Sequence, residues 1–105
     1  MESEVKKYSV IIHDSATEML IEHVRFMAQV SETAALRLVD EFYISAKSLE
    51  NMPERCPWLS GYLFPEKKYR KHIFEKHYML IFQTIGDKVY VDAMIDCRSD
   101  YSWLL

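Results

Sequence analysis

The 105-residue sequence contains only two glycines, two cysteines and three prolines. So little glycine, in a chain that is half hydrophobic, excludes a low-complexity or disordered protein and indicates an ordered globular fold. Cys56 and Cys97 form no CxxC pair, so two free thiols are expected rather than a disulfide framework or a zinc site. No apolar run is long enough for a transmembrane helix or a secretory signal. We therefore expect a cytoplasmic protein that does not contact a membrane.

The sequence also lacks an excess of positive charge, since its formal net charge is -3. Generic nucleic-acid binding depends on Lys and Arg side chains that neutralise phosphates, so this balance argues against it. The charge is unevenly distributed, because residues 1–65 carry a net charge of -4 and residues 66–105 a net charge of +1. The segment EKKYRKHIFEKHYMLIF, residues 66–82, concentrates five Lys or Arg, two His and two Tyr. This basic segment is a local positive island on an acidic chain.

Hydrophobic periodicity predicts a single α+β domain over residues 1–105. A β-branched strand at 8–13 precedes a helix that starts near Ala16, where Ser15 and Glu18 fit a capping box. Ser31 is expected to cap a second helix, which ends before Pro53. Three strands with a period of two then form an antiparallel meander, at residues 69–74, 78–84 and 88–98. The simplest architecture is a helical hairpin packed on one face of an antiparallel sheet, with the other face partly open.

The side chains of the last strand are expected to divide between these two faces. One set should meet the helices: Val89, Val91, Ala93, Ile95 and Cys97. The other set should lie on the open face: Tyr90, Asp92, Met94, Asp96 and Arg98. On the helices, the core is expected to include Leu20, Val24, Phe42 and Leu49.

These elements and several short motifs resemble the RelE/ParE superfamily of bacterial toxins over nearly the whole chain. The motifs are MPERC after the second helix, KYRKHIFEKHYMLIFQTIGDKVYV across the meander, and a closing CRSDY. The resemblance implies the toxin of a type II toxin–antitoxin module of the plasmid-stabilisation kind, held inactive by a cognate antitoxin in a hetero-oligomer. RelE-like members cut messenger RNA on the ribosome, whereas ParE-like members inhibit DNA gyrase. Fold alone does not choose between these targets, and a non-toxic interaction domain is a third interpretation.

The resemblance also implies a functional surface on the open face of the sheet. Arg70 and Arg98 match arginines of the family's nucleases, and Tyr101 lies where some of them place a catalytic tyrosine or histidine. A tyrosine base would need neighbouring cations to lower its pKa from about 10. Further candidates for binding a phosphate or a partner lie in the basic segment: Lys67, Lys68, Lys71, His72 and His77. No metal or other cofactor is expected.

One residue departs from the nuclease pattern. RelE-like sequences commonly read Tyr-Arg-Val-hydrophobic-Tyr on the middle strand of the meander, where this chain reads Tyr78-Met79-Leu80-Ile81-Phe82. Met79 thus takes the place of an arginine that faces the scissile phosphate. Methionine offers neither charge nor hydrogen-bond donor, and removing one such contact typically lowers the rate about a hundredfold or more. The substitution favours a ParE-like binding toxin over a nuclease.

Structural interpretations of the same residues stay open. Lys67 and Lys68 would serve equally well for solubility and for blocking the pairing of a sheet edge. His72 and His77 flank a hairpin turn without a third ligand at a suitable spacing, which favours surface histidines over a metal site. Tyr101 would also fit as a residue that packs against the sheet.

The sequence ends in SWLL, which contains three large apolar residues. Trp103, Leu104 and Leu105 either fold back onto the domain or form a surface for the antitoxin, because exposed aromatic and aliphatic clusters mark interfaces. An acidic antitoxin segment that is disordered when free would cover this end and the basic segment together.

Overall fold

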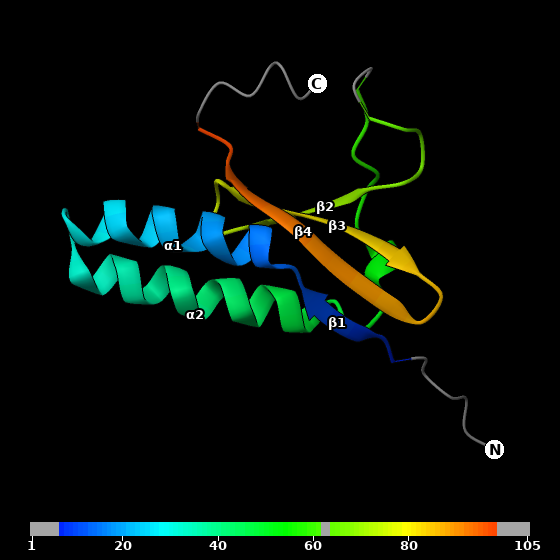
Figure 1. The fold of residues 1–105 in the computed structure, drawn as a ribbon, viewed down its shortest axis with the longest axis horizontal. Coiled ribbons are helices and arrows are strands. Elements are labelled where there is room, and N and C mark those ends of the chain that lie inside the picture. Colours follow the sequence, from blue (N-terminus) through cyan, green and yellow to red (C-terminus); the bar gives the residue numbers. More distant parts are fainter. Residues whose placement is uncertain (1–6, 62–63, 99–105) are drawn as a thin grey trace.

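The computed structural model describes residues 7–61 and 64–98 of the chain (Figure 1). Its elements follow the predicted order of one strand, two helices and three strands, with a short 3-10 helix after the second helix. They are β1 (Ser9–Ile12), α1 (Asp14–Ala28), α2 (Glu32–Ser48), η1 (Pro53–Arg55), β2 (Arg70–Phe74), β3 (Tyr78–Ile85) and β4 (Lys88–Asp96).

The four strands form one sheet with the order β1-β4-β3-β2. The predicted meander is confirmed, because β3 pairs antiparallel with both β2 and β4. The sheet as a whole is mixed, however, since β1 lies beside β4 and runs parallel to it. A wholly antiparallel sheet was therefore the wrong expectation. Figure 1 shows α1 and α2 side by side along one side of this sheet, as the predicted hairpin requires.

The two helices begin in different ways. The Ser31 hydroxyl accepts a hydrogen bond of 3.1 Å from the backbone amide of Ala34, so the predicted cap of α2 is confirmed. The capping box predicted for the first helix is wrong. α1 begins after His13 without a side-chain cap, and the Ser15 hydroxyl instead donates a 2.8 Å hydrogen bond to the backbone carbonyl of Asp92. That bond ties the start of α1 to β4.

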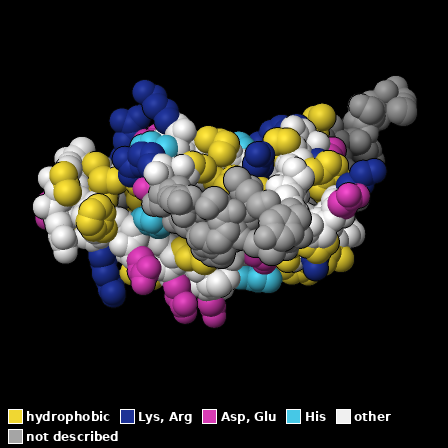
Figure 2. Space-filling view, turned by 90° about the horizontal axis from the view of Figure 1, so that it is seen from above, with side chains coloured by type: hydrophobic (Ala, Val, Ile, Leu, Met, Phe, Trp, Pro, Cys, Tyr) yellow, Lys and Arg dark blue, Asp and Glu magenta, His cyan; other side chains and the backbone are white. Residues whose placement is uncertain are grey.

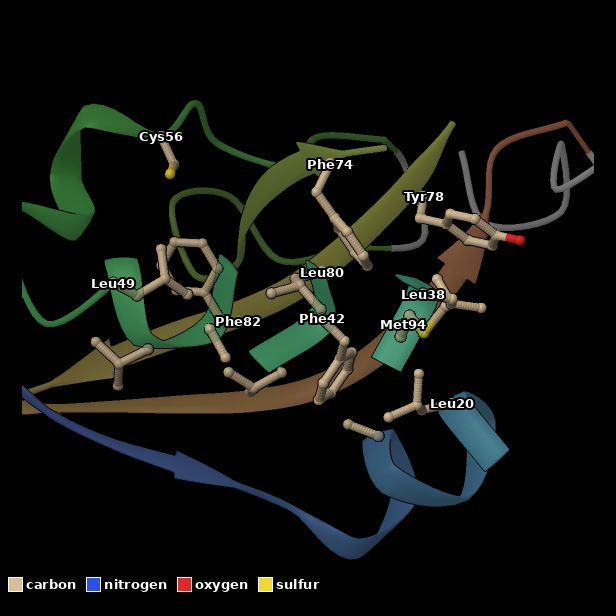
Figure 3. Close-up of a cluster of buried hydrophobic side chains, with 14 residues drawn as sticks. Leu20, Leu38, Phe42, Leu49, Cys56, Phe74, Tyr78, Leu80, Phe82 and Met94 are labelled. Carbon is tan, nitrogen blue, oxygen red and sulfur yellow. The ribbon is translucent and has the colours of Figure 1, made fainter. Parts of the chain in front are cut away.

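The main hydrophobic core lies between the helices and the sheet (Figure 3). From the helices it takes Leu20, Leu38 and Phe42, all at most 4% exposed, and Val24 packs against it in part. From the sheet it takes the alternate residues that face the helices: Phe74, Tyr78, Leu80, Phe82, Val89, Val91 and Met94. Fully burying one such Leu, Phe or Met side chain contributes about 1.5–3 kcal/mol, so this layer supplies much of the fold's stability.

A β-bulge interrupts β4 at Asp92. Ile81 pairs with Ala93 but its neighbour Phe82 pairs with Val91, which leaves Asp92 as an extra residue. An extra residue exchanges the two faces of a strand beyond it, because side chains alternate with a period of two. The predicted division of β4 is therefore correct before the bulge and wrong after it: Met94 packs in the helix-facing core, while Ala93 and Ile95 lie on the opposite face.

That opposite face, which we call the second face, carries its own hydrophobic cluster. Met79, Ile81 and Ile95 are buried there together with Leu59, and Phe64, Tyr69 and Ala93 pack against them. The residues before β2 run along its edge, since Leu59 N donates to Tyr69 O at 2.7 Å and Lys71 N to Pro57 O at 3.0 Å. Leu59, Phe64 and Tyr69 thus cover part of the face that was expected to be open.

Candidate functional site

Arg70 binds the backbone of the segment that follows α2. Its Nη1 donates to the carbonyl of Cys56 at 2.6 Å and to that of Glu54 at 3.3 Å, and its guanidinium lies 3.6 Å from the centre of the Trp58 ring. Arg70 pairs with Phe82, so its side chain is on the helix-facing side of the sheet. Its predicted position on the open face is wrong, because the strand alternation assigns that face to Lys71 instead.

Arg98 forms an ion pair with Asp96. Nε and Nη2 of Arg98 contact the two carboxylate oxygens at 3.1 and 2.8 Å, and the backbone amide of Arg98 adds a third hydrogen bond of 2.9 Å. Burial alone would raise the pKa of Asp96, but the hydrogen bonds and charge of Arg98 outweigh it, so the pKa lies below its usual value. The guanidinium lies 5.9 Å from the Tyr78 ring, which belongs to the helix-facing core. Arg98 was expected to point to the open face of the sheet. That expectation is wrong, because the bulge at Asp92 exchanges the two faces of β4 beyond it.

The two arginines lie near opposite ends of the ladder that pairs β2 with β3. Arg70 pairs with Phe82, whereas Asp96, the partner of Arg98, pairs with Tyr78. Four residues of a strand span roughly 13 Å. The structure thus does not bring Arg70 and Arg98 together as one phosphate site, and Tyr101, the third candidate catalytic residue, lies outside the described residues.

The lysines of the basic segment are spread over the loop before β2 and its start. Lys71 lies on the second face. Burial, and after it the charge of Asp96, raises the pKa of the Cys97 thiol above its usual value, and the charge of Lys71 offsets part of that rise. Lys68 places its ammonium 5.3 Å from the centre of the Tyr69 ring. Lys67 is exposed and has a left-handed backbone with φ of 57°. These positions fit a solvated edge as well as a contact with an anion.

The two histidines of the basic segment have different surroundings. His72 lies beside Arg70 on the helix-facing side, with Nδ1 3.7 Å from the Cys56 sulfur, and burial followed by the charge of Arg55 lowers the pKa of His72. His77 lies in the turn between β2 and β3, with its ring 4.6 Å from that of Tyr78. In the part of the chain that the structure describes, no three His, Cys, Asp or Glu side chains gather closely enough to hold a metal ion.

Met79 belongs to the hydrophobic cluster on the second face. It is 9% exposed and packs with Leu59, Ile81 and Ile95. A nuclease of the resembling family would present an arginine to the phosphate from this position. Here the cluster that surrounds Met79 consists of hydrophobic side chains.

Periodicity did not reveal two polar clusters that the fold assembles. In one, Nδ1 of His13 lies 2.7 Å from Oδ1 of Asp92, and Nε2 of Gln83 donates to Oδ2 at 2.8 Å. In the other, His23 of α1 approaches Tyr78, with ring centres 5.8 Å apart. The sequence carried no signal for either cluster, because their members come from elements far apart in the chain.

The charged side chains do not merge into one patch on the side of the molecule shown in Figure 2. Lys and Arg lie at separate places on the visible surface, and Asp and Glu lie mainly along one edge. Trp103, Leu104 and Leu105, the candidate antitoxin-binding residues, lie outside the described residues. Within the described ranges, no helix is both long and apolar enough to cross a membrane.

Comparison with known proteins identifies the fold. No family model and no curated protein matches the sequence. Among solved structures, a chain of "Chromosomal ParDE TA system from P. aeruginosa" superimposes with a TM-score of 0.69 at 13% sequence identity, covering 87% of this chain and 97% of that chain. The RelE/ParE toxin fold expected from the sequence is therefore confirmed. At this level of identity the similarity establishes the fold and leaves the activity to the site.

Proposed function

We propose that this protein is the toxin of a type II toxin–antitoxin module and that it inhibits growth by binding its target, as ParE-like toxins do, rather than by cutting RNA. The similarity of its fold to a chain of a ParDE system supports the first part of this proposal. The observation that carries the second part is the apolar cluster around Met79, in the place where a nuclease needs a cation.

RNA cleavage without a metal makes two demands that this arrangement meets poorly. A base must deprotonate the 2'-hydroxyl, and preorganised cations must stabilise the charge that develops on the phosphate. The described cations most similar to those of the nucleases already have partners within the fold: Arg70 binds backbone carbonyls, and Arg98 binds Asp96 through Nε and Nη2. Tyr78, beside Arg98, is no substitute base, since burial, and after it the charge of Asp96, raises the pKa of its phenol.

The competing proposal is a RelE-like endoribonuclease that uses Arg98 and Tyr101 as its catalytic residues, with Arg70 as a third. Lys67, Lys68 and Lys71 would then bind phosphates of messenger RNA along the start of β2. One observation favours this alternative: Lys71 pairs with Ile81 and so lies on the same face of the sheet as the Met79 cluster.

A binding toxin needs an exposed surface for its target, and the helical hairpin offers one. Phe26, Val30 and Leu36 lie at its far end and are 69%, 78% and 68% exposed. Large apolar side chains with this exposure are typical of interaction surfaces when they lie together. We propose that the hairpin contacts DNA gyrase, and that the cognate antitoxin covers the basic segment together with Trp103, Leu104 and Leu105.

Induced expression in bacterial cells tests the proposal. We expect growth to stop and gyrase-dependent DNA breaks to accumulate, while transcript ends remain as in uninduced cells. Coexpression of the neighbouring reading frame, expected to encode a small acidic protein with a DNA-binding N-terminus, should restore growth. Codon-phased transcript ends without DNA breaks would instead support the nuclease, and unimpaired growth of cells that contain the folded protein would contradict both toxic functions.

A matched pair of variants connects the effect to the hairpin. Phe26→Ser with Leu36→Ser removes two exposed side chains from the hairpin without opening the core, and should abolish the DNA breaks. Ile85→Ser alters a similarly exposed residue, 58% exposed at the end of β3, and should leave the breaks unchanged. Equal effects of the two variants would exclude the hairpin as the target-binding surface.

A further inference from the structure

Three side chains with nitrogen donors surround Tyr78 at the corner where β3 begins and β4 ends. The ring centre of His77 lies 4.6 Å from that of Tyr78, and the ring centre of His23 lies 5.8 Å from it. The guanidinium carbon of Arg98 lies 5.9 Å from the same ring. The three come from the β2–β3 turn, from α1 and from the end of β4, so only the folded chain brings them together. We call this set, with Tyr78, the corner site.

The turn that positions His77 has a strained backbone. Glu75 and Lys76 have φ angles of 48° and 70°, a left-handed conformation that favours glycine. Non-glycine residues held there cost on the order of 1 kcal/mol each, and such strain persists where the surrounding structure fixes it, often at functional sites. Here Arg37 forms a 3.1 Å ion pair with Glu75, and His77 N donates to Glu75 O at 2.8 Å. The fold thus fixes the position of His77 despite the strain.

The arginines and carboxylates in and beside the corner site form ion pairs with one another. Arg98 is paired with Asp96, and Arg37 with Glu75, so these four side chains contribute no net charge. The imidazoles of His23 and His77 add ring nitrogens that can donate hydrogen bonds to an anion. Both carboxylates that would repel an anion are already bound to an arginine.

The remaining polar groups of the corner site are donors. Burial, and after it the charge of Asp96, raises the pKa of Tyr78, so its phenol stays protonated and can donate a hydrogen bond. Figure 3 shows the ring at the edge of the hydrophobic cluster, with its hydroxyl oxygen directed away from the other labelled side chains. Arg98 binds Asp96 through Nε and Nη2, and among the described residues its Nη1 has no hydrogen-bond partner.

We propose that the corner site binds a phosphate group, which the imidazoles of His23 and His77, the Tyr78 hydroxyl and Nη1 of Arg98 would hold. Donors from several directions suit a tetrahedral oxyanion better than a planar carboxylate. A phosphate group presents several strong acceptor oxygens, which suit this set of donors. The site depends neither on the target of the toxin nor on its toxicity, and it uses His23, which lies outside the basic segment.

Histidine titration by NMR tests this proposal on the wild-type protein. The Cε1 protons of all four histidines are followed against pH in chloride, in inorganic phosphate and in acetate at equal ionic strength. We expect phosphate to raise the apparent pKa of His23 and His77 alone, because a bound dianion stabilises the charged imidazole. His13 and His72 lie outside the corner site and serve as internal controls.

Three results would overturn the proposal. Equal shifts of all four histidines would indicate general screening, no shift would indicate no site, and an equal effect of acetate would indicate carboxylate binding. A variant titration adds a second measurement. His77→Gln should weaken phosphate binding about threefold to tenfold, as the loss of one charge-assisted hydrogen bond at a partly exposed site would. His13→Gln should leave the affinity unchanged, and equal affinities of the wild type and His77→Gln would exclude His77 as a ligand.

Discussion

Replacing Met79 by arginine would restore the residue that a RelE-like nuclease has at this position, and we expect the fold to resist it. Met79 is 9% exposed and packs against Leu59, Ile81 and Ile95. An arginine there would either keep its guanidinium among these side chains or displace the segment that carries Leu59. Both outcomes lower the free energy of unfolding, because no carboxylate belongs to this cluster.

The expected magnitude follows from the buried area that is lost. Full burial of a methionine contributes about 1.5–3 kcal/mol, and the partly desolvated charge adds to that loss, so Met79→Arg should destabilise the protein by about 2–4 kcal/mol. In a domain of about 100 residues, 1 kcal/mol corresponds to about 4–8 °C in Tm. A fall in Tm of at least about 8 °C is therefore expected.

Thermal denaturation followed by circular dichroism measures this effect directly. Met79→Leu conserves the volume and should cost less than about 1.5 kcal/mol. Met52→Arg places the same charge at a residue that is 58% exposed, and should change the free energy of unfolding by less than about 0.5 kcal/mol. If Met79→Arg proved as stable as Met79→Leu, the second face would not be the packed surface described above.

Three further substitutions test individual contacts. Arg70→Lys keeps the charge but loses the planar stack on Trp58 and the hydrogen bond to the carbonyl of Cys56. The free energy of unfolding in urea should therefore fall by about 1–2 kcal/mol. An unchanged midpoint would refute a structural role for this arginine. Asp96→Asn should lower stability at pH 7 and have less effect below about pH 4, because the folded-state pKa of Asp96 is depressed and the stability from Arg98 is lost as the carboxylate protonates. Urea titrations at pH 7 and pH 3 measure this, and an equal deficit at both would contradict it. His13→Gln removes the 2.7 Å contact between Nδ1 and Asp92 and should cost about 0.5–1 kcal/mol, given its partial exposure. No change in thermal denaturation would show that this contact contributes nothing.

The element order was predictable because its signals are local. The 3.6-residue period of the helices, the period of two in the meander and the Ser31 cap each depend on a few neighbouring residues. Leu20, Phe42 and Leu49 follow from the same periodicity and are buried at 4%, 0% and 0% exposure. The parallel neighbour of β4 was not predictable in this way, since nothing within the strand at 9–12 specifies which strand it pairs with.

The sequence alone did not show on which face of the sheet the candidate residues lie, because this depends on the bulge at Asp92. Asp92 becomes the extra residue of the bulge through the pairing of β4 with β3, and the reversal that follows moves Arg98 beside Tyr78. Period-two reasoning treats the strand as regular and so misplaces every side chain after residue 92. Arg70 was misplaced for a related reason, because the expectation assigned a cation to the solvent while the fold uses it to bind backbone carbonyls.

We propose that this protein acts by binding its target and does not cut RNA. The most direct measurement is to add the purified, folded protein to a cell-free translation reaction and to map the ends of the messenger RNA. We predict the same ends as in a reaction without the protein. New ends in phase with the codons, abolished by Arg98→Ala in a variant that remains folded, would contradict the claim and assign the protein to the nucleases.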